Sequence, residues 1–303
     1  MGIYFIVNPI AGKGQTARLA QEFERILQER GIKYKIVFTE YPGHAAKLAA
    51  EIDDKEFSKV VSVGGDGTLN EILNGLNIEK FSLGIIPAGT GNDLIKSVDI
   101  PSNVMVAFEV VLSGEKRSID IGYIQNKRFI NVAGFGFDVE VLRETEKLKK
   151  IVKGKVAYVL GVIKAIISFK PVKLHISIDG IEYKREAMVC AIGNGQYFGG
   201  GMKILPKAEL DDGLYDICII KKLPKPVLLY HFPKVFKGTH LEIPWVEYLK
   251  GKNVKILTQE PVLVNFDGEV SQQEVPDFNI IKNGLNILVP KKSGTTLVIE
   301  RQF

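Results

Sequence analysis

The sequence predicts an α/β plus β protein, with an N-terminal parallel sheet covered by helices and a C-terminal antiparallel β-sandwich. Two observations predict this fold class. Over the first third of the 303 residues, short β-branched runs alternate with helical segments, which is typical of a parallel sheet covered on both faces. From about Ile119 strand-like segments dominate, and Asp-Gly or Asn-Gly turns separate them, as in antiparallel sandwiches.

The elements of the first part follow from this alternation. The expected strands are 3–7, 33–39, 59–63 and 82–86, and the expected helices are 16–30, 44–52, 69–76 and 104–112. Gly31 stands where the first helix should end. Thr68-Leu69-Asn70-Glu71 has the pattern of a capping box at the start of the third helix.

The second part is expected to be mostly strand. The expected strands are 128–132, 173–178, 187–192, 215–220, 254–258, 261–266 and 286–289, with one helical insertion from 139 to 169. We place the domain boundary near Asp120–Tyr123. This gives an α/β domain over 1–122 and a β-sandwich domain over 123–291, and we expect the tail 292–303 to pack back on the first domain.

Composition narrows the class of protein. The net charge of +5 is too small to indicate a nucleic-acid partner. Cys190 and Cys218 lie in apolar runs, which predicts buried thiols in a reducing compartment. The chain enters a strand directly after Met1, and the longest apolar stretch, 156–169, is interrupted by Lys164 and too short to span a bilayer. These features predict a soluble, cytoplasmic protein.

The segment Gly64-Gly65-Asp66-Gly67-Thr68 joins a predicted buried strand to a predicted helix. Glycines let backbone N–H groups approach a ligand, and a helix N-terminus favours an anion. A carboxylate would repel a bare phosphate, so Asp66 indicates a site in which a cation such as Mg²⁺ accompanies a nucleotide. A purely structural turn is the alternative interpretation.

Two further glycine-rich loops follow predicted strands of the same sheet: Asn8-Pro9-Ile10-Ala11-Gly12-Lys13-Gly14 and Pro87-Ala88-Gly89-Thr90-Gly91-Asn92-Asp93. Ligands of such sheets bind beyond the carboxyl ends of the strands, where these loops meet. Lys13 offers an ammonium to phosphate oxygens, although a solvated loop lysine would look the same. Thr90 and Asn92 suit phosphate or ribose contacts, or the capping of the next helix.

Two Asp-Gly pairs in the second part are first of all turn signals, at Asp212-Gly213 and Asp267-Gly268. Glu269, directly after the second pair, could instead face a cleft and accept the proton of an attacking hydroxyl. Asp267 is the neighbouring carboxylate that could take this role. The four histidines show no spacing suited to a metal or to a catalytic triad.

Taken together, these segments resemble the diacylglycerol kinase catalytic-domain family, which includes soluble bacterial lipid kinases and is related to sphingosine and ceramide kinases. The resemblance covers nearly the whole chain. It rests on Asn8–Gly14, Gly64–Thr68 with Asn70-Glu71, Pro87–Asp93, Gly193–Met202, Pro206–Asp216 and Asp267–Glu269.

The resemblance implies an NAD kinase-like and diacylglycerol kinase-like architecture, in which 1–122 is the nucleotide-binding domain, 123–291 is the lipid-substrate domain and the active site lies between them. It implies an ATP-dependent lipid kinase that transfers the γ-phosphate to a lipid hydroxyl, such as that of diacylglycerol, with Glu269 as general base. It places Mg²⁺ near the Asp212 side chain and the carbonyls of Glu209 and Leu214, although Asp211 would fit a register shifted by one. The implied nucleotide-binding residues are Asn8, Lys13, Thr39, Gly64, Gly65, Asp66, Gly67, Thr68, Gly89, Thr90 and Asn92.

The resemblance also places Lys155 in the active-site network. Lys155 belongs to a basic run with Lys147, Lys149, Lys150 and Lys153, which could be a solvated face. Because the run adjoins an apolar helix, it could instead give peripheral contact with anionic lipid at a membrane, while the apolar face of that helix could equally be sandwich core. An NAD kinase and a nucleotide-binding regulator without catalysis are the rival functions. The lipid acceptor and the oligomeric state, a homodimer included, stay open.

Overall fold

The computed structural model describes residues 1–89, 91–136, 139–141, 144, 147, 161, 164–166, 168–257, 262–267 and 269–291, and at Glu269 the backbone alone. The first elements are β1 (Gly2–Val7), η1 (Ala11–Gly14), α1 (Thr16–Glu29), β2 (Tyr34–Phe38), α2 (His44–Ala50), β3 (Phe57–Gly64), α3 (Asp66–Gly75), β4 (Ser82–Pro87), α4 (Asp93–Ser97) and α5 (Val104–Ser113).

The remaining elements are mostly strands. They are β5 (Glu115–Ile124), β6 (Lys127–Phe129), β7 (Val132–Gly136), β8 (Val172–Ile178), β9 (Ile181–Gly193), β10 (Tyr215–Lys221), α8 (Lys225–Lys237), η2 (His240–Glu242), β11 (Val246–Gly251), β12 (Asn253–Ile256), β13 (Val262–Phe266), β14 (Glu269–Gln273) and β15 (Asp277–Val289).

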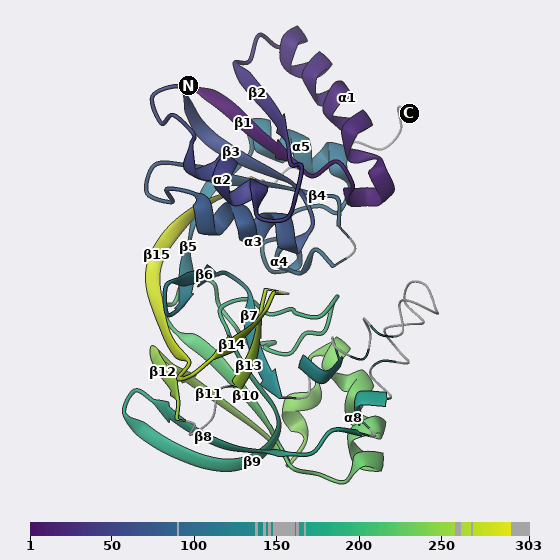
Figure 1. Cartoon of the computed structure of the whole chain (residues 1–303), viewed down its shortest axis with the longest axis vertical. Coiled ribbons are helices and arrows are strands. Elements are labelled where there is room, and N and C mark those ends of the chain that lie inside the picture. Colours follow the sequence, from purple (N-terminus) through teal and green to yellow (C-terminus); the bar gives the residue numbers. More distant parts are fainter. Residues whose placement is uncertain are drawn as a thin grey trace.

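The N-terminal part is a parallel sheet with helices on both faces, which confirms the predicted fold class (Figure 1). Its strand order is β15-β4-β3-β1-β2, and each neighbouring pair is parallel. On one face, Phe23 of α1 and Phe108 of α5 pack on Phe5 of β1. On the other face, α2 and α3 bury Ala45 and Ile72. Burial on both faces explains the near-continuous apolar runs of these strands.

The C-terminal part is the expected antiparallel β-sandwich. Strands β8, β9, β10 and β11 pair in antiparallel fashion, β7 and the β13–β14 hairpin continue from β9, and β12 continues from β8. Its core contains the rings of Phe129, Tyr215 and Phe278, with Phe129 stacked on Tyr215 at 5.8 Å between centroids. Asp-Gly turns separate several of these strands, as predicted from the sequence.

The two parts are joined by β5 and β15, which run side by side between them (Figure 1). The first half of β15 pairs with Ile121–Ile124, and its second half pairs with Glu115–Ile119. Asn286 and Ile287 also lie parallel to Ser82 and Leu83 of β4. The last strand therefore completes the first sheet. The domain bounds 1–122 and 123–291 stay a prediction, and the tail 292–303 lies outside the described residues.

The second part contains a helix besides the predicted insertion 139–169, so the prediction of a single helical segment is incomplete, although the described residues between 139 and 168 are helical as predicted. Residues Lys225–Lys237 form the helix α8, although Pro226 and Pro233 lie within it. Proline is tolerated in the first turn of a helix, but inside a helix it removes a backbone donor, so the sequence disfavours this assignment. Only parts of the predicted insertion 139–169 lie within the described residues.

The predicted capping box is also wrong. Helix α3 begins at Asp66, two residues before Thr68, and its N-cap Gly65 makes no side-chain capping bond. Thr68 Oγ1 instead accepts a hydrogen bond from Asn8 Nδ2, and the Glu71 carboxylate accepts one from the N–H of Ala45. The capping pattern is therefore used for contacts between loops and helices, which local spacing does not predict.

The predicted strand 128–132 is interrupted in the structure. Strand β6 ends at Phe129 and β7 starts at Val132. The N–H groups of Ile130, Asn131 and Val132 point to one carboxylate, that of Asp267, at 2.8, 3.0 and 3.2 Å. A long-range partner has taken the donors of Ile130 and Asn131, so the two strands are separate.

Within the part of the chain that the structure describes, no helix is long and apolar enough to cross a membrane.

Tyr215 should stabilise the junction of the two parts. Its buried hydroxyl accepts the N–H of Tyr123 in β5 at 3.1 Å and donates to the carbonyl of Asn279 in β15 at 2.7 Å. Because Tyr215→Phe leaves both backbone groups without this partner, we expect a loss of roughly 1–3 kcal/mol in the free energy of unfolding. Chemical denaturation measures this loss. The control is Tyr183→Phe on the half-buried Tyr183 of β9; an equal loss in both variants would contradict the assignment.

Candidate active site

The three glycine-rich loops lie together at the carboxyl ends of β1, β3 and β4. Asn8 Nδ2 donates to Thr68 Oγ1 at 3.1 Å and so joins the first loop to the second. The second and third loops touch at Gly65 and Gly89, where a Cβ on Gly89 would stand 2.4 Å from the Gly65 Cα. Only glycine allows this approach, so these positions are required for the loops to close on one another.

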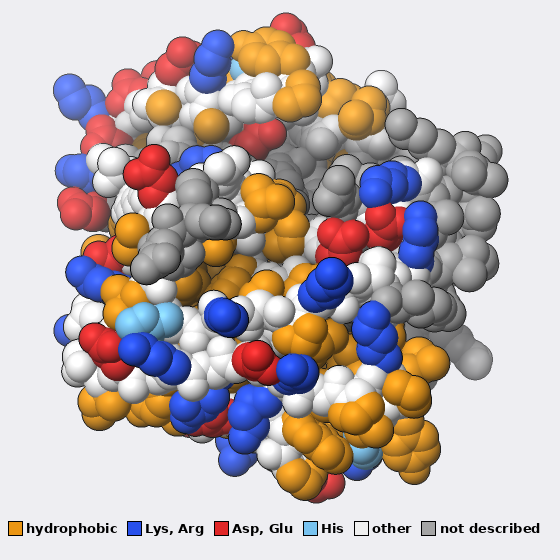
Figure 2. All heavy atoms as spheres, turned by 60° about the horizontal axis from the view of Figure 1, so that its bottom comes forward, with side chains coloured by type: hydrophobic (Ala, Val, Ile, Leu, Met, Phe, Trp, Pro, Cys, Tyr) orange, Lys and Arg blue, Asp and Glu red, His pale blue; other side chains and the backbone are white. Residues whose placement is uncertain are grey.

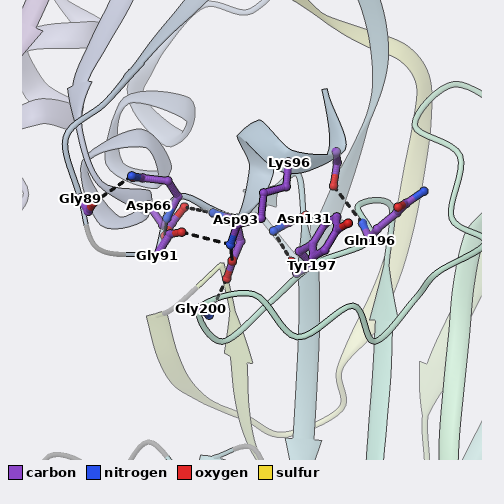
Figure 3. Close-up of polar contacts among 11 residues, drawn as sticks. Asp66, Gly89, Gly91, Asp93, Lys96, Asn131, Gln196, Tyr197 and Gly200 are labelled. Carbon is purple, nitrogen blue, oxygen red and sulfur yellow. Dashed lines mark hydrogen bonds and ion pairs between the residues drawn. The ribbon is translucent and has the colours of Figure 1, made fainter. Parts of the chain in front are cut away.

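Asp66 fixes the third loop. Its carboxylate accepts the N–H of Asn92 at 2.8 Å and the N–H of Asp93 at 3.0 Å (Figure 3). A side chain at Gly91 would lie 2.5 Å from an Asp66 oxygen, so the loop is held tightly over the carboxylate. Burial raises the pKa of Asp66, and the nearby Asp93 carboxylate raises it further. Asp66 thus determines the shape of the rim on which the predicted nucleotide site lies.

Asp93 connects the two parts of the protein. Its side chain is 8% exposed, and one oxygen pairs with Lys96 Nζ at 2.7 Å. The other oxygen accepts the N–H of Gly200, from the loop after β9, at 2.7 Å (Figure 3). Lys96 also lies over the ring of Tyr197, with its Nζ 5.7 Å from the ring centroid. The N-terminal rim and the C-terminal loop therefore meet at one buried carboxylate.

The β13–β14 hairpin reaches the same region. Its turn residue Asp267 has a left-handed backbone, with φ 46°, and its carboxylate accepts the three N–H groups between β6 and β7. Burial raises the pKa of Asp267 to about 6, and the charge of Asp66 contributes to the rise. Asp267 therefore ties the turn of the hairpin to the segment that joins β6 and β7.

The predicted nucleotide-binding residues stand on this rim where the structure describes them. Lys13 is exposed and has a left-handed backbone, with φ 59°, between Gly12 and Gly14. Thr39 follows β2 at the same edge, and its N–H donates to the carbonyl of Val7 at 2.9 Å. Thr90 and Lys155 lie outside the described residues.

Glu269, the predicted base, is placed by its backbone. It starts β14 and pairs with Phe266 across the hairpin turn. The carboxylate of Asp267, two residues away, accepts the N–H groups of Ile130, Asn131 and Val132. Gly268, between them, lies outside the described residues.

The predicted Mg²⁺ loop contains a cluster of carboxylates around one lysine. Asp212 pairs with Lys250 Nζ at 2.8 Å, and Lys250 lies 3.6 Å from Asp216. Asp216 is fully buried, and its polar neighbours are Lys250 and the Tyr248 hydroxyl. Burial raises its pKa, with the neighbouring Tyr248 hydroxyl and Lys250 acting in the opposite direction. A buried carboxylate of this kind fits a cation.

The alternative ligand Asp211 points elsewhere, since it pairs with Arg117 at 3.0 Å. No group of three or more His, Cys, Asp or Glu side chains within the described ranges is arranged to hold a metal. Any Mg²⁺ here would therefore depend on main-chain carbonyls in addition to Asp212 and Asp216.

The sequence interpretation missed Asp93, Lys96 and Gly200 as site residues. Asp93 ends the glycine-rich loop 87–93, and Gly200 lies within the segment 193–202 that carries the family resemblance, so both belong to motifs that the sequence shows. Their contact spans 107 residues of sequence, and no local pattern predicts it.

A parallel sheet with three glycine loops at its carboxyl edge, facing a β-sandwich, defines a two-domain phosphotransferase. The family described as "Diacylglycerol kinase catalytic domain" matches residues 2–124, and "YegS C-terminal NAD kinase beta sandwich-like domain" matches residues 131–289. The chain belongs to the diacylglycerol kinase catalytic-domain family and is a diacylglycerol kinase-like phosphotransferase.

Several relatives match over their full length. The chain is 30% identical to a diacylglycerol kinase of Bacillus subtilis, covering 96% of this chain and 97% of that protein. It is 31% identical to a diacylglycerol kinase of Staphylococcus epidermidis, covering 94% of this chain and 91% of that protein. A crystal structure of a diacylglycerol kinase from Bacillus anthracis superposes with a TM-score of 0.79 at 27% identity, covering 96% and 97% of the two chains.

Asp267 should make stability depend on pH. Its folded pKa of about 6 lies above the ordinary aspartate pKa of 3.8, so the folded protein holds a proton that the unfolded chain releases between these values. The stabilisation is present below about pH 4 and is lost as pH rises through 6, by up to about 3 kcal/mol. We expect the difference in unfolding free energy between wild type and Asp267→Asn to fall over this range. A constant difference in denaturation between pH 4 and 7 would contradict the prediction.

Proposed function

We propose that the protein is an ATP-dependent lipid kinase that transfers the γ-phosphate of ATP to the hydroxyl of a lipid such as diacylglycerol. The observation that carries the proposal is the full-length similarity to diacylglycerol kinases, combined with the contact of Asp93 and Gly200 between the glycine-loop rim and the sandwich. Other acceptors of the same kind are phosphatidylglycerol, a sphingoid base and a polyprenol.

The rim supplies the nucleotide site in this proposal. Lys13 offers a positive charge to the phosphates from an exposed loop, and the neighbouring Asn8 and Thr68 keep that loop on the rim. Asp66 accepts the backbone N–H groups of Asn92 and Asp93, and these two hydrogen bonds hold the third loop, with Gly89, in place. When bound, Mg²⁺-ATP supplies the γ-phosphoryl group, with the metal neutralising part of its charge.

Glu269 is the proposed general base. The β13–β14 hairpin that carries it is fixed by Asp267, which accepts the N–H groups of Ile130 and Asn131. A base on this hairpin would take the proton of the lipid hydroxyl as the oxygen attacks phosphorus. Lys155 is proposed to assist from the insertion outside the described residues.

We also propose that the turn at Asp212 binds Mg²⁺, in addition to the Mg²⁺ that accompanies ATP. The side chains of Asp212 and Asp216, with the carbonyls of Glu209 and Leu214, would hold a cation there and brace β10 against β11. Cytoplasmic location, peripheral membrane contact through the basic run 147–155 and a homodimer remain proposals.

The decisive experiment offers the purified protein ATP with a mixed lipid extract and, separately, with NAD. Mass spectrometry of the products identifies the acceptor. A phosphorylated lipid with no phosphorylated NAD supports the proposal. Phosphorylation of NAD alone would favour the NAD kinase alternative, and no ATP turnover with any acceptor would favour a regulator without catalysis.

Glu269→Gln should abolish most of the turnover while leaving binding intact. Glutamine keeps the size of the side chain but removes the proton acceptor, so kcat should fall by roughly 10²–10⁴-fold with KM for ATP little changed. Initial rates over a range of pH measure this, and the rise of wild-type activity with pH should be absent from the variant. Glu274→Gln, on an exposed glutamate shortly after the same strand, is the matched control. Equal losses in both variants would refute the assignment.

Lys13→Ala should weaken the use of ATP. Loss of a charged hydrogen bond to phosphate predicts a fall of roughly 10- to 100-fold in kcat/KM for ATP. The KM for a micellar lipid acceptor should stay within about twofold, because the residue lies on the nucleotide side. Arg18→Ala, an exposed cation at the start of α1, serves as control. An effect confined to the KM for the lipid would contradict the proposal that Lys13 binds the nucleotide.

A further inference from the structure

Helix α8 exposes large apolar side chains to solvent. Tyr230 is 78% exposed, Leu229 is 48% exposed and Phe236 is 43% exposed. Single exposed apolar residues are common on protein surfaces, but several on one helix form a patch that marks an interaction site. Figure 2 shows hydrophobic side chains gathered with Lys or Arg at the lower right, on the side where Figure 1 places α8.

These side chains share one face of the helix. The exposed positions Pro226, Leu229, Tyr230, Pro233 and Phe236 recur at intervals of three and four residues. The opposite face buries Leu228 and Val235 in the core under the helix. Because that inner face already anchors the helix, folding does not explain the outer apolar face.

The charge of α8 is entirely positive. Its 13 residues include Lys225, Lys234 and Lys237 and no acidic residue, with lysines at both ends of the apolar face. This charge complements an anionic surface. A symmetric contact with a second copy would instead bring the same lysines together, since such a contact pairs a patch with itself.

The helix is also connected to the candidate active site. The N–H of Lys203 donates to the carbonyl of Val235 in α8 at 3.0 Å. The loop before Lys203 is closed by two backbone hydrogen bonds between Phe198 and Met202, and both of these side chains lie in the same core cluster as α8. Within that loop, Gly200 donates its N–H to Asp93. A surface bound to α8 is thus connected to the cleft by a single loop.

We infer that the outer face of α8 docks on the surface of an anionic lipid bilayer. Leu229, Tyr230 and Phe236 enter the boundary between headgroups and acyl chains, and the lysines contact anionic headgroups. The inference rests on the proposed function in one respect, because a lipid acceptor reaches the cleft from a bilayer. It deepens that function by naming the surface that meets the lipid.

The test measures binding without catalysis. Sedimentation with vesicles of phosphatidylglycerol or of phosphatidylcholine compares wild type with Leu229→Ser/Tyr230→Ser and with Lys237→Glu. We expect wild type to bind phosphatidylglycerol vesicles more tightly than phosphatidylcholine vesicles. The serine variant should bind them at least tenfold more weakly, and the glutamate variant several-fold more weakly. The matched controls are Ile281→Ser, which removes an apolar side chain 51% exposed on β15, and Lys55→Glu; both should bind like wild type.

Three results would overturn the inference. The first is wild-type binding in both α8 variants, and the second is an equal loss in the controls. The third is a wild-type dimer in analytical ultracentrifugation that the serine variant dissociates while vesicle binding is unchanged, which would assign the face to a second copy. Thermal unfolding checks that the variants fold. If the Leu229→Ser/Tyr230→Ser variant does not fold, the binding of Lys237→Glu decides the test. Kinase activity on a micellar lipid is measured separately, so a failure of the proposed function appears there and leaves the sedimentation result intact.

Discussion

The structure depends on buried and partly buried carboxylates that accept backbone N–H groups. Asp66 takes two such groups from the third glycine loop, Asp93 takes that of Gly200, and Asp267 takes those between β6 and β7. A charge removed from water is costly unless donors surround it, so each carboxylate forces its loop into one shape. Loops without regular secondary structure therefore determine the shape of the glycine-loop rim and its contact with the β-sandwich.

The neighbouring Asp66 and Asp93 have an electrostatic consequence, since the N–H of Asp93 donates to the Asp66 carboxylate at 3.0 Å. Burial raises the pKa of Asp66, and the charge of Asp93 raises it further. Like charges held together favour a cation between them or a proton on one of them. The Mg²⁺ of the proposed Mg²⁺-ATP would offset this repulsion.

The sequence predicted the elements of the first domain well because their signals are local. β-Branched runs and helix stops such as Gly31 give strands and helices whose bounds differ from the structure by a few residues. The fold class and the family were also predicted correctly. The predictions that failed depend on tertiary structure. Helix α8 forms in spite of its prolines, because its inner face packs on the core. Thr68 and Glu71 bond to distant segments, and Asp267 interrupts a strand far from it in sequence. For the site, motifs identified the loops, but the contact of Asp93 with Gly200 required the tertiary structure.

The pairing of β15 with β4 and β5 has a consequence for how the chain folds during synthesis. Asn286 and Ile287 are the parallel neighbours of Ser82 and Leu83, so the first sheet gains this strand only after residues 286 and 287 have been synthesised. Until then β4 and β5 present open edges, and pairing over such a sequence separation is slow. The first sheet therefore stays incomplete while the β-sandwich is synthesised, and the nascent protein is exposed to aggregation over that interval.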